Sequence, residues 1–239
     1  MAILQEQLFR NINYYISKNN FGNFVLDTNI MNNINIPRTI DKEIAHTELK
    51  TIKNVFDKFK IRFFLTHGTC LGAIREKDFI DYDSDIDIGC YKKDLNNIIL
   101  AIQELKEKYS FKITKLSLDD ESITIIKDNV VIDISLYKLE GNIWSANRHK
   151  VFIIPYHFLD KLEEIDFLGI KIKVPYNVER YLEYQYGKDW RIPIKDFYSS
   201  YRQKIELPIK NILKYIVGIK MASYIAKNIS IIIKKIRKS

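Results

Sequence analysis

The sequence predicts an α/β (α+β) fold in which a small mixed sheet is flanked by helices and followed by a helical C-terminal lobe and a basic amphipathic tail. Hydrophobic residues make up 46% of the 239 residues, whereas there are only 8 glycines and 5 prolines. Such a composition is typical of a globular chain with a buried core and excludes a disordered or collagen-like one. Stretches with apolar residues three or four positions apart, and stretches in which apolar and polar residues alternate, indicate both helices and strands.

The first half of the chain predicts, in order, a helix, a strand that ends in a turn, and a second strand. Apolar residues recur at helical spacing up to about residue 60. Residues 61–74 begin with a β-prone run and reach a glycine-containing turn at Gly68, which favours the order strand, turn, helix. Residues 84–91 alternate carboxylates with isoleucines, which is the pattern of a strand with two different faces.

The middle of the chain predicts one helix followed by three strands. Residues 92–109 have helical periodicity, and the β-prone runs 111–118, 122–128 and 130–139 are separated by short turns. Strands joined by such short turns favour an antiparallel meander. The last of the three strands has Asp133 among branched apolar residues.

Charge and cysteine content limit the class of protein. The net charge is +8, but residues 211–239 contain 7 basic residues and no acid, so the remaining chain carries only +1. A body without a basic excess argues against a duplex-binding surface, and we do not favour a nucleic-acid partner. Cys70 and Cys90 are too few for a disulfide framework and lack zinc-site spacing. With no leader-like or spanning segment in the sequence, we expect a cytoplasmic protein.

Three aspartates carry the predicted chemistry. Asp85 and Asp87 are two positions apart on one strand, so both side chains point to the same face, and we expect them to be exposed in a cleft. Burying Asp133 among apolar residues costs free energy unless it is paired or binds a cation. If the two strands are neighbours, the three carboxylates converge and favour Mg²⁺ or Mn²⁺. Gly68 allows close approach to a phosphate, and Thr69 adds a hydroxyl. The pattern indicates metal-dependent phosphoryl transfer.

A simpler interpretation of Asp83, Asp85 and Asp87 is a solvated acidic strand at the edge of a sheet. For an isolated pair of alternating aspartates that interpretation is the better one. Here a strand with a glycine-containing turn precedes the acids by fewer than twenty residues, and Asp133 follows on an apolar strand. Together these features favour the metal site.

The segment THGTCLGAIREKDFIDYDSDIDI resembles the signature of the LicD/fukutin-type family within the nucleotidyltransferase superfamily, and FLGIKIKVPYNVERYLEYQYGKDWRIP is similar to the C-terminal part of that family. Together the two segments cover roughly residues 60–195. Ser84 stands where the family often has another acid, and Cys70 stands where an aliphatic residue is usual. The positions that match the first signature are His67, Gly68, Thr69, Leu71, Gly72, Ala73, Arg75, Asp83, Asp85, Asp87 and Ile88.

The resemblance implies a nucleotidyltransferase-fold catalytic domain over residues 1–205, with a motif core at about 60–140 and a C-terminal lobe at about 141–205, before the tail at 206–239. It also implies transfer of a substituted phosphate, of phosphocholine or polyol-phosphate type, from a CDP-activated donor. The acceptor would be a sugar hydroxyl of a cell-surface glycan or of its lipid-linked precursor, as in lipopolysaccharide or capsule biosynthesis.

The same resemblance implies the roles of individual residues. Asp85 and Asp87 hold the metal that bridges the donor pyrophosphate, and Asp133 completes a second site and accepts the proton of the sugar hydroxyl. Arg75 holds phosphate, and His67 either contacts the donor or hydrogen-bonds the turn. The substrate-binding residues on this view are His67, Gly68, Thr69, Arg75 and Asp83.

Two other functions remain open at this point. A nucleotidyltransferase that moves an NMP from an NTP to a small molecule or an RNA end would use the same carboxylates. A catalytically inactive, membrane-associated binding protein could keep the same fold. The tail at 211–239 places Lys220, Lys227 and Lys234 on one side of a helix, which favours peripheral contact with the inner face of a membrane or, alternatively, packing on the body.

Overall fold

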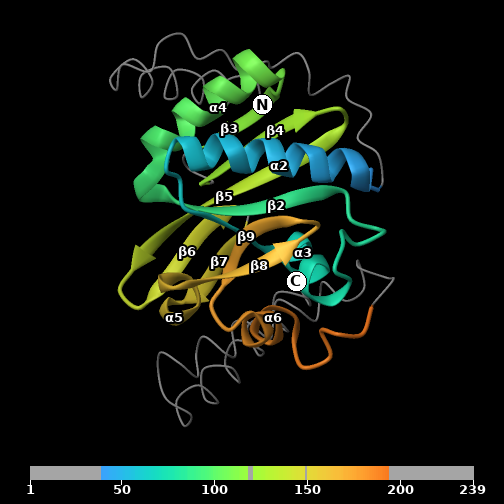
Figure 1. Cartoon of the computed structure of the whole chain (residues 1–239). Helices are drawn as coiled ribbons and strands as arrows, with labels where there is room; N and C mark the ends of the chain where they lie inside the picture. The colour runs from blue at the N-terminus through green and yellow to red at the C-terminus, as the bar shows by residue number, and fades with distance from the viewer. Residues whose placement is uncertain (1–38, 118–120, 149, 194–239) are drawn as a thin grey trace, which may run out of the picture. The chain divides into compact units, whose positions relative to one another are not determined.

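The computed structural model describes residues 39–117, 121–148 and 150–193, shown in colour in Figure 1. Described residues up to Val178 form one unit, and those from Glu179 onward belong to a second. The tail predicted at 206–239, including its proposed membrane face, lies outside the described residues. No helix in the described ranges is both long enough and apolar enough to cross a bilayer.

The first unit is built on a mixed sheet in the order β1-β2-β5-β4-β3, and β6 and β7 extend it from the end of β5. Strand β2 runs antiparallel to β1 and parallel to β5, whereas the other neighbours are antiparallel. The mixed sheet and the antiparallel meander of β3, β4 and β5 confirm the sequence prediction. The strands are β1 Phe63–Leu65, β2 Asp85–Tyr91, β3 Lys112–Ser117, β4 Ser122–Lys127, β5 Val130–Glu140, β6 Ile143–Arg148 and β7 Lys150–Pro155.

Two longer helices pack against each other, α2 (Lys42–Lys58) and α4 (Leu95–Tyr109) (Figure 1). Helix α4 follows the short 3-10 turn η1 (Lys92–Asp94), and α2 also contacts β5. Helix α2 begins where the side chain of Asp41 accepts hydrogen bonds from the first-turn N–H groups, which is the usual function of an aspartate cap. The apolar stripe predicted for this helix is buried, and its fully buried positions include Leu49, Ile52 and Phe56. Both helices confirm the periodicity in the sequence.

A short helix, α3 (His67–Arg75), follows β1 after a single residue, as the strand, turn and helix pattern predicted. It packs on β2. Its fit against the loop that leads to β2 depends on glycine: a Cβ atom at Gly72 would lie 2.6 Å from the backbone oxygen of Asp78. The first turn of α3 lies beside the strand that carries the aspartates, because Gly68 and Thr69 both hydrogen-bond Asp87.

The segment after residue 141 has more strand than the helical lobe expected from the sequence. It contains β6, β7 and the hairpin of β8 (Leu162–Phe167) and β9 (Ile170–Pro175), besides the helices α5 (Tyr156–Asp160) and α6 (Val178–Tyr186). In β9, apolar side chains are buried and the lysines between them are exposed, which is the period of a strand. The hairpin turns at Leu168 and Gly169, both with positive φ, and β9 packs against β1.

Candidate active site

The pairing of β2 with β5 brings two of the predicted aspartates directly opposite each other. The strands are parallel, and Asp87 is in register with Asp133, while Asp85 precedes Asp87 on the same face. One carboxylate oxygen from each of the three aspartates lies within 4.8 Å of the others. The strands β2 and β5 are neighbours, as the predicted convergence of the three carboxylates requires.

The burial of these carboxylates determines their electrostatics. Only 8% of Asp87 and 5% of Asp133 is exposed, whereas Asp85 is half-buried. The expectation of exposed acids in a cleft is therefore wrong for Asp87, because its strand lies inside the sheet with a neighbour on each side. Like charges this close and this little hydrated repel strongly, and a divalent cation bound by hard oxygen ligands relieves that repulsion. The donor set fits Mg²⁺ or Mn²⁺.

Hydrogen bonds from neighbouring elements hold two of the carboxylates in place. The hydroxyl of Thr124 on β4 donates to Asp133 Oδ1 at 2.6 Å. The backbone N–H of Gly68 donates to Asp87 Oδ2 at 3.1 Å, and the N–H of Asp87 donates to Thr69 Oγ1 at 2.8 Å. Thr69 is buried, and its hydroxyl joins α3 to β2. These contacts make Thr69 and Thr124 positioning residues for the aspartates.

Asp83 lies against the first turn of α3. A Cβ atom at Gly68 would come within 2.3 Å of Asp83 Oδ2, so only glycine leaves room for this carboxylate. Burial raises the pKa of Asp83, and this effect is partly offset by the N–H of Ser84 and by the side chain of Asp85. The close approach predicted at Gly68 is present, and in this structure the group that approaches is a carboxylate of the chain.

His67 begins α3 in the left-handed region of backbone conformation, with φ of +43°. A residue other than glycine held there costs on the order of 1–3 kcal/mol, and such residues gather at functional sites. His67 immediately precedes Gly68, whose N–H donates to Asp87, so its backbone lies at the end of α3 that is near the aspartates. A role in donor contact stays a prediction.

Arg75 lies at the other end of α3 from Gly68. Its Nε donates to Glu76 Oε1 at 2.7 Å, and its terminal nitrogen reaches the hydroxyl of Tyr82 at 3.4 Å. About seven residues of helix, roughly 10 Å of rise, separate the backbones of Arg75 and Gly68. The structure brings the aspartates and Gly68 together and does not bring the backbone of Arg75 to the same point, so phosphate binding by Arg75 stays a prediction.

Thr124 is the site residue that sequence reasoning missed. Threonine is common in strands, and nothing in the local pattern SITIIKD marks its hydroxyl as different. Only the cross-strand register, in which Thr124 faces Asp133, reveals its function. The sequence would indicate this function only if the pairing of β4 with β5 were already known, because Thr124 and Asp133 then lie side by side on one face of the sheet.

Comparison with known proteins shows which family the chain resembles. Residues 60–177 match the family model described as LicD/FKTN/FKRP, nucleotidyltransferase domain. Ribitol-5-phosphate transferase FKTN of Mus musculus is 35% identical over 173 residues, which cover 66% of this chain and 35% of that protein. Ribitol 5-phosphate transferase FKRP of Mus musculus is 26% identical over 147 residues, 57% of this chain and 30% of that protein. The chain thus spans about a third of the length of these curated relatives.

Two solved structures to which the chain is similar come from antibiotic resistance. The lincomycin-bound lincosamide adenylyltransferase LnuA is 18% identical, with a TM-score of 0.41 over 57% of this chain and 83% of that one. The antibiotic-resistance factor ANT(2'')-Ia is 11% identical, with a TM-score of 0.46 over 83% of this chain and 97% of that one.

The mixed sheet, its flanking helices and the aspartate cluster define a nucleotidyltransferase-type α/β protein. Over residues 60–177 the chain belongs to the LicD family. The family resemblance drawn from the residues around Gly68 and Asp87 is confirmed.

Proposed function

We propose that this chain is a divalent-metal-dependent transferase that moves a substituted phosphate, of polyol-phosphate or phosphocholine type, from a CDP-activated donor to a sugar hydroxyl of a glycan. The observation that carries the proposal is the in-register pairing of Asp87 with Asp133, which, with Asp85, collects three carboxylates at one point. The relatives named as ribitol-5-phosphate transferases favour the polyol-phosphate type of donor.

In this proposal Asp85, Asp87 and Asp133 hold Mg²⁺ or Mn²⁺. When bound, such an ion orients the phosphoryl oxygens and neutralises the charge that develops on the leaving group. The Gly68 N–H and the Thr124 hydroxyl fix the carboxylates that hold it. Orientation of this kind by neighbouring groups usually changes metal affinity by about 10–100-fold.

The transfer itself needs one proton acceptor. The oxygen of the sugar hydroxyl forms a bond to the phosphorus of the substituted phosphate, and the bond from that phosphorus to the CMP oxygen breaks. The hydroxyl proton passes to a carboxylate of the cluster, and we assign this step to Asp133. The products are CMP and a glycan that carries the new phosphodiester.

The proposal is tested by thermal unfolding with a panel of nucleotides in Mg²⁺ and in EDTA. The panel contains CDP-ribitol, CDP-choline and CTP. We expect a CDP-linked compound to raise the melting temperature only with metal, because binding to the native state alone stabilises it. Asp85→Asn/Asp87→Asn should lose the effect. Asp128→Asn/Asp189→Asn, which removes two exposed acids elsewhere, is the matched control and should retain it.

Each contrary result points to one of the other functions. Stabilisation by CTP alone, with release of pyrophosphate on turnover, would favour nucleotidyl transfer. Absence of any metal-dependent stabilisation by any of the nucleotides would favour a catalytically inactive binding protein. Formation of CMP together with a modified glycan would establish the proposed reaction.

A further inference from the structure

An exposed aromatic residue lies at the junction of β7 and α5. Tyr156 is the first residue of α5, and 37% of its surface is exposed. Its N–H donates to the carbonyl of Asn142 at 3.0 Å, and its own carbonyl accepts from the indole N–H of Trp144 at 3.3 Å. Pro155 precedes it with φ of −53°, in the range that a proline ring imposes. The backbone of Tyr156 is therefore held from both sides.

The side chain of Tyr156 is held as well. Its ring is parallel to the ring of Trp144, with an interplanar angle of 6° and 6.4 Å between the ring centres, which is an offset stack. Its hydroxyl donates to Asp160 Oδ1, and this bond raises the pKa of Tyr156. Among the described residues, Trp144 is the one ring that contacts Tyr156. The exposed area of Tyr156 therefore lies on the other face of its ring and along the ring edge.

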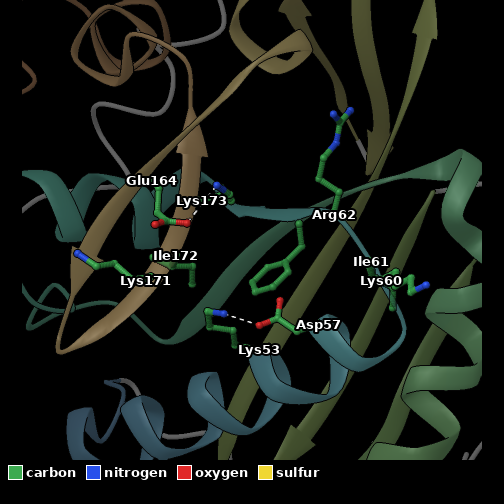
Figure 2. Close-up of a pocket in the computed structure, with 10 residues that line it drawn as sticks. Lys53, Asp57, Lys60, Ile61, Arg62, Glu164, Lys171, Ile172 and Lys173 are labelled. Carbon is green, nitrogen blue, oxygen red and sulfur yellow. Dashed lines mark hydrogen bonds and ion pairs between the residues drawn. The ribbon is translucent and has the colours of Figure 1, made fainter.

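A series of ring contacts supports Tyr156 from inside the molecule. Trp144 is 6% exposed, and its ring centre lies 5.0 Å from that of the buried Tyr91. The guanidinium of Arg62 in turn lies 4.3 Å from the Tyr91 ring centre. Figure 2 shows the Arg62 side chain pointing away from the cavity of about 300 Å³ beside β1 that this residue borders. The series thus joins the start of β1, the end of β2, β6 and α5.

The series of rings begins on the face of the sheet that carries the aspartates. Tyr91 follows Asp87 by four residues on β2, so both side chains lie on one face, about 13 Å apart along the strand. Trp144 pairs with Leu139, six residues after Asp133 on β5, which is about 20 Å of strand. Strands β6 and β7 and helix α5 lie together beyond that end of β5 (Figure 1). Tyr156 is thus remote from the reacting phosphorus.

The chemistry around Tyr156 suits a sugar ring. One face of a pyranose presents C–H groups with a small positive charge, which the negative face of an aromatic ring attracts. The sugar hydroxyls lie around the edge, where a carboxylate accepts their hydrogen bonds. Asp160 accepts one bond from Tyr156 at Oδ1, and an ionised carboxylate has about four acceptor positions. A cytosine base would also stack, but the base of a donor whose phosphates lie at the aspartates does not extend that far.

We propose that Tyr156 and Asp160 form a subsite for a neutral sugar ring of the acceptor glycan, away from the hydroxyl that reacts. This assignment rests on the proposed transfer to a glycan. The ring of Tyr156 supports one face of the sugar, and Asp160 accepts hydrogen bonds from the hydroxyls at its edge. The subsite selects acceptors of several sugar units over single sugars. Contacts this far from the reacting atoms are equal in the ground and transition states, so they act on the acceptor KM and not on kcat.

The test follows the binding of neutral disaccharides to the full chain by saturation-transfer NMR. The probes are lactose, cellobiose, mannobiose and chitobiose, with sorbitol as a reference that has hydroxyls but no ring. Tyr156→Ala removes the aromatic ring, Tyr156→Phe keeps it, and Tyr109→Ala is the matched control, because Tyr109 on α4 is 39% exposed. We expect wild type, Tyr156→Phe and Tyr109→Ala to bind a disaccharide through its C–H protons and not to bind sorbitol. Tyr156→Ala should bind it about tenfold more weakly.

Stabilisation by a CDP-linked donor in Mg²⁺ separates this subsite from the proposed reaction and should be the same in wild type and all variants. Equal disaccharide binding by wild type and Tyr156→Ala, or no binding of any disaccharide, would overturn the subsite and leave the proposed reaction intact. Sugar binding that depends on Tyr156, in a chain that no CDP-linked donor stabilises, would keep a sugar site and reject its role toward an acceptor. Sedimentation with phosphatidylglycerol vesicles that depends on Tyr156, without disaccharide binding, would overturn the proposal in favour of a membrane contact.

Discussion

Asp133 shows at the level of one residue how the site is held. It is 5% exposed in a strand of branched apolar residues, where an isolated carboxylate would lose most of its hydration. The Thr124 hydroxyl at 2.6 Å replaces part of that hydration. Bonds to an ionised acceptor of this kind contribute about 1.5–3 kcal/mol.

Thr124→Val is therefore expected to weaken metal binding while preserving the shape of the side chain. The variant loses the donor to Asp133 and should bind Mg²⁺ about 10–100-fold more weakly. Titration of the thermal stability with Mg²⁺ measures the change. Thr114→Val is the control, because Thr114 bonds to the carbonyl of Thr124 and not to a carboxylate. Equal Mg²⁺ affinity in the two variants would remove Thr124 from the site.

Sequence predicted the residues whose relations are local. The two-residue spacing places Asp85 and Asp87 on one face without any knowledge of the fold. The group that lies against Gly68 could not be predicted in this way, because its contact with the Asp83 carboxylate depends on how the loop returns to β2. Such relations arise from tertiary packing, which no local pattern encodes.

At the scale of elements, the loop that joins α3 to β2 is held by the start of α2. Lys42 on α2 bonds to Asp78 at 3.0 Å and to Asp81 at 2.5 Å, and the N–H of Ile40 donates to the carbonyl of Asp83 at 2.7 Å. The Asp81 contact raises the pKa of Lys42 and lowers the pKa of Asp81. Helix α2 thereby fixes the loop that leads into the aspartate strand.

Lys42→Met should lower the melting temperature at neutral pH and not in acid. A lowered pKa means that Asp81 stabilises the fold above about pH 4, and this contribution is lost as the pH falls through its folded-state value. The raised pKa of Lys42 keeps its contribution up to about pH 10, after which it is lost. Melting curves of wild type and variant, measured from about pH 7 down to about pH 2, follow the loss of this difference, which should also shrink in about 1 M salt. A pH-independent difference would contradict the ion-pair account.

Elements with a long, regular pattern of apolar residues were predicted correctly, whereas the short hairpin of β8 and β9 was not. Helices α2 and α4 have long apolar stripes, and β3, β4 and β5 are separated by short turns. The hairpin of β8 and β9 was missed as strand, because its lysines and acids hide a short alternation and its turn has no Asn-Gly or Asp-Gly pair. Strand β9 also packs against β1, a contact that the sequence does not show.

At the scale of the whole molecule, the aspartate cluster works against stability when no cation is bound. Three carboxylates within 4.8 Å repel one another, and folding brings them together from strands that are far apart in the sequence. Functional sites commonly reduce stability in this way. The repulsion should be measurable as a free energy of unfolding that rises when one charge is removed.

Asp87→Asn is expected to raise the free energy of unfolding in EDTA by about 1 kcal/mol and to lower it in saturating Mg²⁺ relative to wild type. The amide oxygen still accepts from the Gly68 N–H, so the change is mainly one of charge. Urea unfolding in both conditions measures the two differences. A decrease of equal size in EDTA and in Mg²⁺ would show that Asp87 is a packing residue and not a cation ligand.

The parallel pairing of β2 with β5 also determines where the chain can change length. Residues 92–129 connect the two strands, and Thr124 within this connection donates a hydrogen bond to Asp133. An insertion in a turn of this connection leaves the register of Asp87 with Asp133 intact. One residue inserted between Val130 and Asp133 would instead turn Asp133 to the opposite, apolar face of the sheet. The turns of this connection can therefore change in length, whereas the stretch from Val130 to Asp133 cannot without moving a carboxylate of the site.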